Sequence, residues 1–154
     1  MKIKLMILLI AVSLFSAIYT VSAQENEAIV GVKSAKAFFD FRIGEPTNAV
    51  GHMEVIHQTY KDLAAMKKKP VFVVVFMGSS LKLFSKNNEE FSPEVAGTIS
   101  AMAKDGIKFE ICMVAVKILE VDSMSILPEI KKVDNGWISE IGYQYKGYRL
   151  VPVY

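Results

Sequence analysis

The sequence predicts an α/β fold, a three-layer sandwich in which a mostly parallel sheet of five strands has helices on both faces. Residues 71–77 (VFVVVFM) are a continuous apolar run rich in β-branched residues, which is typical of a strand buried on both faces. Segments with strand patterns alternate with segments of helical period, and this order indicates a parallel sheet covered by helices. No repeat, low-complexity tract or linker divides the chain, so one domain is expected.

The first strand and the first helix have clear local signals. Residues 36–42 (KAFFDFR) are rich in aromatics and nearly alternate, which is typical of a strand. In the loop that follows, Thr47 or Asn48 is placed to cap a helix. Apolar residues then recur at steps of three and four until the lysines at 67–69, where the helix dipole favours cations, and a proline stops the helix.

The second strand is the apolar run itself, and a glycine-serine segment follows it at 78–80. A short helical stretch comes next. Ser92-Pro93-Glu94 then predicts the start of a longer helix, because it combines a cap, a proline at the first position and an acid in the first turn. Gly106 ends that helix.

Three more strands are expected at 107–112, 130–133 and 148–153. The first of them alternates and ends at Cys112, and an apolar segment that can start a helix follows directly. Asn135-Gly136 usually indicates a hairpin. Here, however, apolar and aromatic residues follow at four-residue spacing, namely Trp137, Ile141 and Tyr145. This spacing favours a turn from strand into helix.

Residues 1–23 have the order of positive charge, apolar core and small-residue cleavage site that is typical of a secretory signal peptide. Cleavage is expected after Ala23. The alternative is a membrane anchor, but a spanning helix needs about 20 predominantly apolar residues, and hydroxyl side chains interrupt this run. We therefore expect a periplasmic or secreted protein with a flexible leader at 24–35 and one α/β domain at 36–154.

The signal peptide also accounts for the positive net charge of the chain. The sequence has 18 Lys and Arg and 16 Asp and Glu, and the signal contains two of the lysines and no acid. The mature chain is therefore formally neutral, and it has no general attraction for nucleic acid or for an anionic membrane surface. We expect no nucleic-acid partner, and no membrane association after cleavage.

A ligand site is predicted at the carboxyl ends of the strands, because open α/β sheets bind ligands there. The serine-containing segment after the second strand could offer backbone N–H groups to an anion. Three segments are expected to converge at this edge, namely residues 42–44, 78–80 and 112–113. The candidate ligand-binding residues in them are Arg42, Gly44, Gly78, Ser79, Ser80 and Met113, and Cys112 is the candidate nucleophile.

Cys112 is the only cysteine, so the chain cannot form an internal disulfide. A thiol at a strand end that faces a helix N-terminus can have a lowered pKa and can act as a nucleophile. The alternative is a buried packing residue, because unpaired cysteine is among the most buried residue types and the flanking residues are apolar. Both interpretations stay open at the level of sequence.

Familiar catalytic and metal-binding patterns are absent from the sequence. His52 and His57 are five residues apart, so they point to different faces of one helix and cannot form an i, i+4 metal pair. There is no nucleophile elbow, phosphate-binding loop or dinucleotide motif. We expect no metal and no cofactor.

The C-terminal third carries an ordered set of recognisable residues. The set begins with Cys112 at the end of a strand introduced by DGIKF, and continues with Leu127-Pro128, Val133, Asn135-Gly136-Trp137, and Gln144 before Gly147-Tyr148. Together with the strand VFVVVFMG and the entry KDGI to the third strand, this set resembles the DsrE family of small sulfur-relay-like proteins. The resemblance covers most of residues 36–154.

The resemblance implies a flavodoxin-like α/β sandwich that assembles into homotrimers or homohexamers. It also implies that a cysteine at the position of Cys112 carries sulfur as a persulfide in the members that transfer sulfur, with a donor or acceptor protein as partner. Two features depart from the family. The cysteine is followed by Met113-Val114-Ala115, where small or polar residues are common in the family. The sulfur-relay members act in the cytoplasm, whereas this chain is expected to be exported.

Two functional hypotheses follow. In the first, the protein is a thiol-dependent sulfur carrier in which Cys112 accepts sulfane sulfur and passes it on. In the second, it is a non-catalytic, oligomeric periplasmic module that binds a small ligand or a protein, and Cys112 is structural.

The C-terminal segment is rich in aromatic residues, which suit either an interface between copies or the packing of the last helix on the sheet. These residues are Trp137, Tyr143, Tyr145, Tyr148 and Tyr154.

Overall fold

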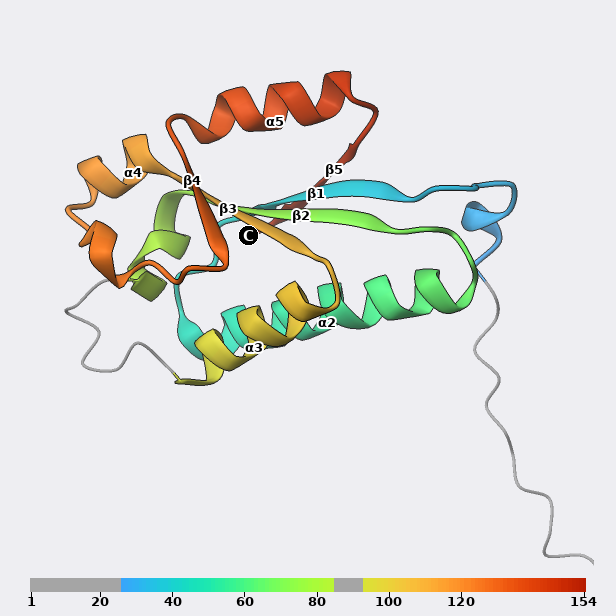
Figure 1. Cartoon of the computed structure of the whole chain (residues 1–154), viewed down its shortest axis with the longest axis horizontal. Helices are drawn as coiled ribbons and strands as arrows, with labels where there is room; N and C mark the ends of the chain where they lie inside the picture. The colour runs from blue at the N-terminus through green and yellow to red at the C-terminus, as the bar shows by residue number, and fades with distance from the viewer. Residues whose placement is uncertain (1–25, 85–92) are drawn as a thin grey trace, which may run out of the picture. The chain divides into compact units, whose positions relative to one another are not determined.

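The computed structural model describes residues 26–84 and 93–154 (Figure 1). The predicted signal peptide, its cleavage site and the expected helix cap Ser92 lie outside these residues. Residues 26–31 contain one short 3-10 turn, η1 (Glu27–Ile29), and the sheet domain comprises the described residues from 32 onward. Within the described part of the chain, no helix combines the length and the apolar character that crossing a bilayer requires.

Five strands form one sheet in the order β4-β3-β2-β1-β5, and every neighbouring pair is parallel. The predicted five-stranded α/β fold is therefore confirmed. The order differs from the 2-1-3-4-5 order of flavodoxin itself, so the likeness to flavodoxin lies in the layered architecture. The strands are β1 (Lys36–Phe41), β2 (Val71–Phe76), β3 (Lys108–Cys112), β4 (Ile130–Val133) and β5 (Arg149–Val153).

Helices cover both faces of the sheet and complete the three layers (Figure 1). Helices α2 (Pro46–Ala65) and α3 (Pro93–Lys104) pack together on one face, and α5 (Gly136–Tyr145) lies on the other. The short elements η2 (Gly78–Phe84), α4 (Met113–Ile118) and η3 (Ser123–Ser125) gather near the carboxyl ends of the strands. Asn135 caps α5, so the expected turn from strand into helix is confirmed.

The start of α2 differs from the prediction, because Glu45 is the cap rather than Thr47 or Asn48. The Glu45 carboxylate accepts hydrogen bonds from the backbone N–H groups of Thr47 at 3.0 Å and Asn48 at 2.7 Å, and these bonds lower the pKa of Glu45. Pro46 causes the shift, since proline is favoured at the first helical position and the residue before it becomes the cap.

The end of α2 also differs from the prediction. The helix ends at Ala65, and Lys67 and Lys69 have φ angles of 59° and 47°. Residues with positive φ have left the right-handed helical conformation. The lysines therefore follow the last turn instead of belonging to it.

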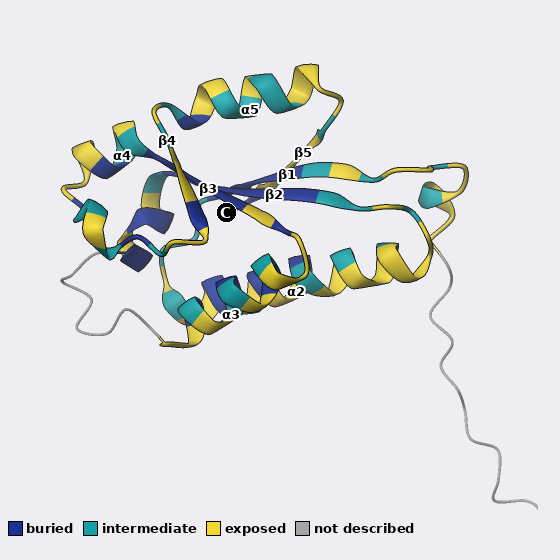
Figure 2. Ribbon diagram, in the orientation of Figure 1, coloured by how far each residue is buried: buried dark blue, intermediate teal, exposed yellow. Residues whose placement is uncertain are grey.

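The sheet separates two hydrophobic cores of unequal size. The larger lies between the sheet and α2 with α3, where the Phe76 ring lies 5.4, 5.1 and 5.9 Å from those of Phe41, Phe84 and Phe109. The smaller lies beneath α5. Both faces of β2 are therefore buried, as its continuous apolar run predicts (Figure 2). The smaller core consists of Phe38, Val73, Val75, Met77 and Cys112.

Candidate functional site

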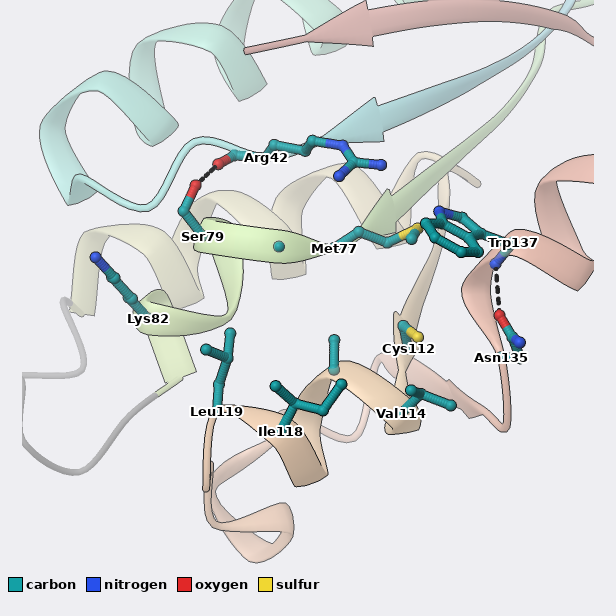
Figure 3. Close-up of a pocket in the computed structure, with 12 residues that line it drawn as sticks. Arg42, Met77, Ser79, Lys82, Cys112, Val114, Ile118, Leu119, Asn135 and Trp137 are labelled. Atoms are coloured by element: carbon teal, nitrogen blue, oxygen red, sulfur yellow. Dashed lines mark hydrogen bonds between the residues drawn. The ribbon is translucent and has the colours of Figure 1, made fainter.

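A pocket of about 520 Å³ lies at the carboxyl ends of the central strands (Figure 3). Its walls come from the ends of β1, β2 and β3, from η2 and α4, and from the start of α5. We call it the strand-end pocket, and its position is the one that parallel sheets use for ligands. It is lined by Arg42, Met77, Gly78, Ser79, Lys82, Cys112, Val114, Ala115, Ile118, Leu119, Asn135 and Trp137.

Four of the seven predicted site residues line this pocket, namely Arg42, Gly78, Ser79 and Cys112. Gly44 lies just behind the wall, where a Cβ atom would overlap the carbonyl group of Ser79. The Ser79 hydroxyl also donates to the Arg42 carbonyl. The glycine is required here because it lets the segment after β1 pack directly against the segment after β2.

Ser80 and Met113 do not line the pocket. Ser80 is fully buried, and its hydroxyl donates to the Met77 carbonyl at 2.9 Å. The Ser80 N–H bonds the same carbonyl at 3.4 Å, so this N–H already has an acceptor. Met113 begins α4 and packs against the larger core instead.

Several lining residues were not predicted, and two signals in the sequence could have found some of them. Val114 with Ile118, and Ala115 with Leu119, are four residues apart and share one side of a helix that starts at the strand ends. Asn135 follows β4, whose carboxyl end lies at the same edge of the sheet. Met77, Lys82 and Trp137 had no such signal.

Cys112 ends β3 and lies in the pocket wall with only 3% of its surface exposed. It occupies the cap position of α4, but its side chain makes no capping hydrogen bond. The helix has six residues, and the Val114 N–H of its first turn donates to the Asp134 carbonyl at 3.2 Å. The surroundings of Cys112 are therefore those of a packing residue.

Gly136 allows α5 to begin directly against the wall of the pocket. A Cβ atom on Gly136 would lie 2.9 Å from Met77 Sδ and 3.0 Å from Cys112 Cβ. The Asn135 side chain caps the helix by accepting from the Trp137 N–H at 3.0 Å (Figure 3). This close approach brings the Trp137 side chain to the pocket.

A layer of polar side chains lies between the sheet and α5, next to the pocket. Alternation along β1 places Asp40 and Arg42 on this face. Arg42 Nε donates to both carboxylate oxygens of Asp40 at 2.9 Å, and the Tyr154 hydroxyl donates to one of them at 3.3 Å. The bonds to Asp40 raise the pKa of Arg42. Asp40 is 4% exposed, so it depends on these partners.

Two further carboxylates belong to the same layer. On α5, burial and the nearby Asp40 raise the pKa of Glu140 to about 7, while Arg42 opposes the shift, and the Oε1 atom of Glu140 is buried without a hydrogen-bond partner in the described part of the chain. Glu110 accepts from the Tyr143 hydroxyl at 2.8 Å and lies 3.8 Å from Lys131 Nζ. We call these residues the polar layer: Asp40, Arg42, Glu110, Glu140, Tyr143 and Tyr154.

The polar layer was not predicted, although the strand sequences contain a signal for it. Asp40 and Glu110 alternate with aromatic and aliphatic residues inside predicted strands. When both faces of a sheet are covered by helices, a charged residue in a central strand has to be buried and paired. Across residues 26–84 and 93–154, no three His, Cys, Asp or Glu side chains are grouped to hold a metal ion.

Comparisons with known proteins support the fold and do not assign a family. No protein-family model matches the chain, and no curated protein matches it. A solved structure with the same fold is that of MTH1491 from Methanobacterium thermoautotrophicum, a protein of unknown function. The two chains superpose with a TM-score of 0.63 and 14% sequence identity, over 77% of this chain and 99% of the other.

We predict that Gly136→Ala destabilises the protein by about 1–3 kcal/mol, because the new methyl group overpacks the contact with Met77 and Cys112. Denaturant unfolding of the purified variant measures this. Gly142→Ala, on the same helix, is the matched control. Nothing lies within 4 Å of its new Cβ atom, so it should stabilise by about 0.5–1 kcal/mol through helix propensity. Equal effects of the two substitutions would contradict the close packing of α5 on the pocket wall.

Proposed function

We propose that this protein is a binding module that holds a small, mainly apolar ligand in the strand-end pocket. The observation that carries this proposal is the chemistry of the lining. Half of the described lining residues are apolar, and the described lining includes no carboxylate and no imidazole for general acid–base catalysis. The apolar members are Met77, Val114, Ala115, Ile118, Leu119 and Trp137.

The size of the pocket supports the same proposal. Its volume of about 520 Å³ lies within the range of roughly 300–1,000 Å³ that is usual for small-molecule sites. Apolar walls with a few polar groups are also typical of such sites, because burial supplies the affinity and the polar groups set the orientation. The burial of Cys112 fits a structural thiol in this wall.

The neutral fluorophore N-phenyl-1-naphthylamine is a suitable probe for this pocket. We expect saturable binding, detected by energy transfer from Trp137, which is the only tryptophan and lines the pocket. Ile118→Asp should weaken binding by about tenfold or more, because Ile118 is 73% exposed in the free protein and a bound apolar ligand would desolvate the new carboxylate. The control is Val55→Asp, at an exposed position of α2. Absence of saturable binding, or equal affinities in the two variants, would count against the proposal.

A second candidate function is that of an exported, DsrE-like sulfur carrier. The observation that favours it is that Cys112 lines the pocket, at the edge of the sheet where ligands bind. In this reaction the Cys112 thiolate attacks the outer sulfur of a donor persulfide. The donor S–S bond breaks, an S–S bond forms on Cys112, and the donor leaves as a thiolate. No oxidant is consumed, and the reverse step passes the sulfur to an acceptor thiol.

Intact mass of the protein from the envelope fraction tests this candidate together with export. The carrier hypothesis predicts a chain that begins at Gln24 and carries about 32 Da per added sulfur. Reductant should remove the added mass, and Cys112→Ser should lack it. An unmodified thiol that resists alkylation until the protein unfolds would reject the carrier hypothesis and leave the binding module. A chain that retains residues 1–23 would reject cleavage.

We also propose that the protein is a homo-oligomer that assembles through α5. Only Gly136 of this helix is buried, whereas Ile138, Ile141 and Tyr145 are 68%, 54% and 89% exposed. Neighbouring exposed apolar side chains suit an interface between copies. Of the aromatic C-terminal residues, Tyr143 and Tyr148 pack at a ring distance of 4.9 Å against the smaller core, so that part of the segment has a packing role.

Sedimentation of the purified protein tests the assembly. We expect a species larger than a monomer, with a trimer or a hexamer implied by the family resemblance. Ile138→Glu combined with Ile141→Glu should dissociate it, because two carboxylates would be buried in an apolar contact. The same number of new charges at Val55 and Val30, both exposed and distant from α5 in sequence, should leave it assembled. A wild-type monomer would refute the proposed interface.

A further inference from the structure

We infer that the ligand of the strand-end pocket is an amphipathic anion, whose single anionic group binds the Arg42 guanidinium and whose binding is tight only while Glu140 is uncharged. This inference rests on the proposed function, because it names the chemical class of ligand for the same pocket. Three observations support it: the placement of Arg42, the charges that line the pocket, and the position of Glu140 in the polar layer.

Arg42 has donors available at the pocket. Its described side-chain hydrogen bonds use only Nε, which is held by Asp40. The terminal amino groups lie at the pocket wall, where Nη1 is 3.6 Å from the position that a Cβ atom on Gly78 would take. A guanidinium that is anchored through Nε presents its remaining donors in a fixed orientation, which suits a carboxylate or a related oxyanion.

The charges of the lining favour an anion over a cation or a neutral ligand. Among the described residues that line the pocket, the charged ones are Arg42 and Lys82, and both are cations. The rest of the wall is mainly apolar, so a ligand with an apolar body and one anionic end matches both parts. A charge held next to apolar walls is screened less than one in water, which strengthens its attraction for the guanidinium.

Glu140 competes with such a ligand for Arg42. The charges of Asp40 and Arg42 act on its carboxyl group through space, and its buried Oε1 has no hydrogen-bond partner in the described residues. When Glu140 is ionised, two carboxylates act on Arg42, Asp40 in direct contact and Glu140 through space, and a ligand anion would be the third. Protonation of Glu140 removes one negative charge and leaves the guanidinium balanced only by Asp40. Binding of the anion and protonation of Glu140 therefore favour each other.

Several other charged groups lie on the elements that pack against α5. Helix α5 packs against β1, β2, β3 and β5. On this face β2 contributes only the apolar residues of the smaller core. His52 and His57 lie on α2, across the sheet from α5. The charged and titratable groups on this face of the packed elements include Lys36 and Asp40 of β1 with Arg42 after it, Lys108 and Glu110 of β3 with Lys131 of β4 beside Glu110, and Tyr148 and Tyr154 on either side of β5.

The sign of the pH effect follows from these charges. Burial raises the pKa of Glu140 to about 7, so the group is mostly neutral below that pH and mostly ionised above it. The affinity for an anion should be highest below pH 7 and should fall as the pH rises through this value. The fall approaches about tenfold per pH unit above the pKa if the complex requires the proton. A neutral ligand should show no such dependence.

Two matched probes test the inference. 1-Anilinonaphthalene-8-sulfonate is N-phenyl-1-naphthylamine with an added sulfonate, which stays ionised at every pH used. We expect the sulfonate to bind at about pH 6 at least tenfold more tightly than at about pH 8.5, and the neutral probe to bind equally at both. Glu140→Gln should abolish the pH dependence and raise the affinity for the sulfonate at the higher pH.

Arginine substitutions test the anion contact. Arg42→Met should weaken sulfonate binding at about pH 6 by roughly tenfold or more and change neutral-probe binding by less than about twofold. Arg149→Met is the control, because Arg149 is the only other arginine and is exposed on β5. Since Arg42→Met leaves buried Asp40 without its partner, the double variant Asp40→Asn with Arg42→Met repeats the test without an unpaired charge.

The outcomes separate this inference from the proposed function. If neutral-probe binding is saturable but the sulfonate binds no better, or if both Arg42 variants bind the sulfonate like wild type, the inference is wrong and the binding module stands. A wild-type sulfonate affinity that does not change with pH overturns the role of Glu140. If neither probe binds, the proposed function fails and the inference fails with it.

Discussion

The burial of the Asp40 carboxylate beneath α5 is the constraint on which this face of the molecule depends. An unpaired carboxylate at that depth would cost several kcal/mol, and Arg42 offsets the cost because alternation places it on the same face two residues along β1. Tyr154 adds a second donor from the residue after β5. The Tyr154 hydrogen bond therefore joins the ends of β1 and β5, and the ion pair holds the guanidinium at the pocket.

The unequal coverage of the sheet explains several features at once. Two long helices bury one face, whereas α5 covers the other with a core of five buried residues (Figure 2). The polar layer fills part of the remaining space beneath the helix, and the outer apolar side chains of α5 stay exposed. Its first residue, Gly136, packs closely on Met77 and Cys112, and the next residue, Trp137, lines the pocket. The pocket and the exposed face thus depend on the same helix.

Cys112 shows how position and environment point to different chemistry. Its place at the end of β3 brings it to the edge of the sheet where ligands bind, whereas its burial among Met77, Val75 and Phe38 is that of a packing side chain. The structural similarity to MTH1491 concerns the fold alone, at 14% sequence identity. The chemistry of the pocket lining, and not the architecture of the fold, therefore carries the information about function.

The sequence by itself determined where the helices and strands lie along the chain, because each carries its own local period, cap or breaker. The run VFVVVFM and the turn at Asn135-Gly136 are examples, and even the cap of α2, which differs from the prediction, is set locally by Pro46. Only the tertiary structure decided that the charge of Asp40 would act on Glu140, and that Trp137 would line the same pocket as Arg42. These residues are about a hundred positions apart, and local patterns of hydrophobicity contain no information about which distant side chains share one space.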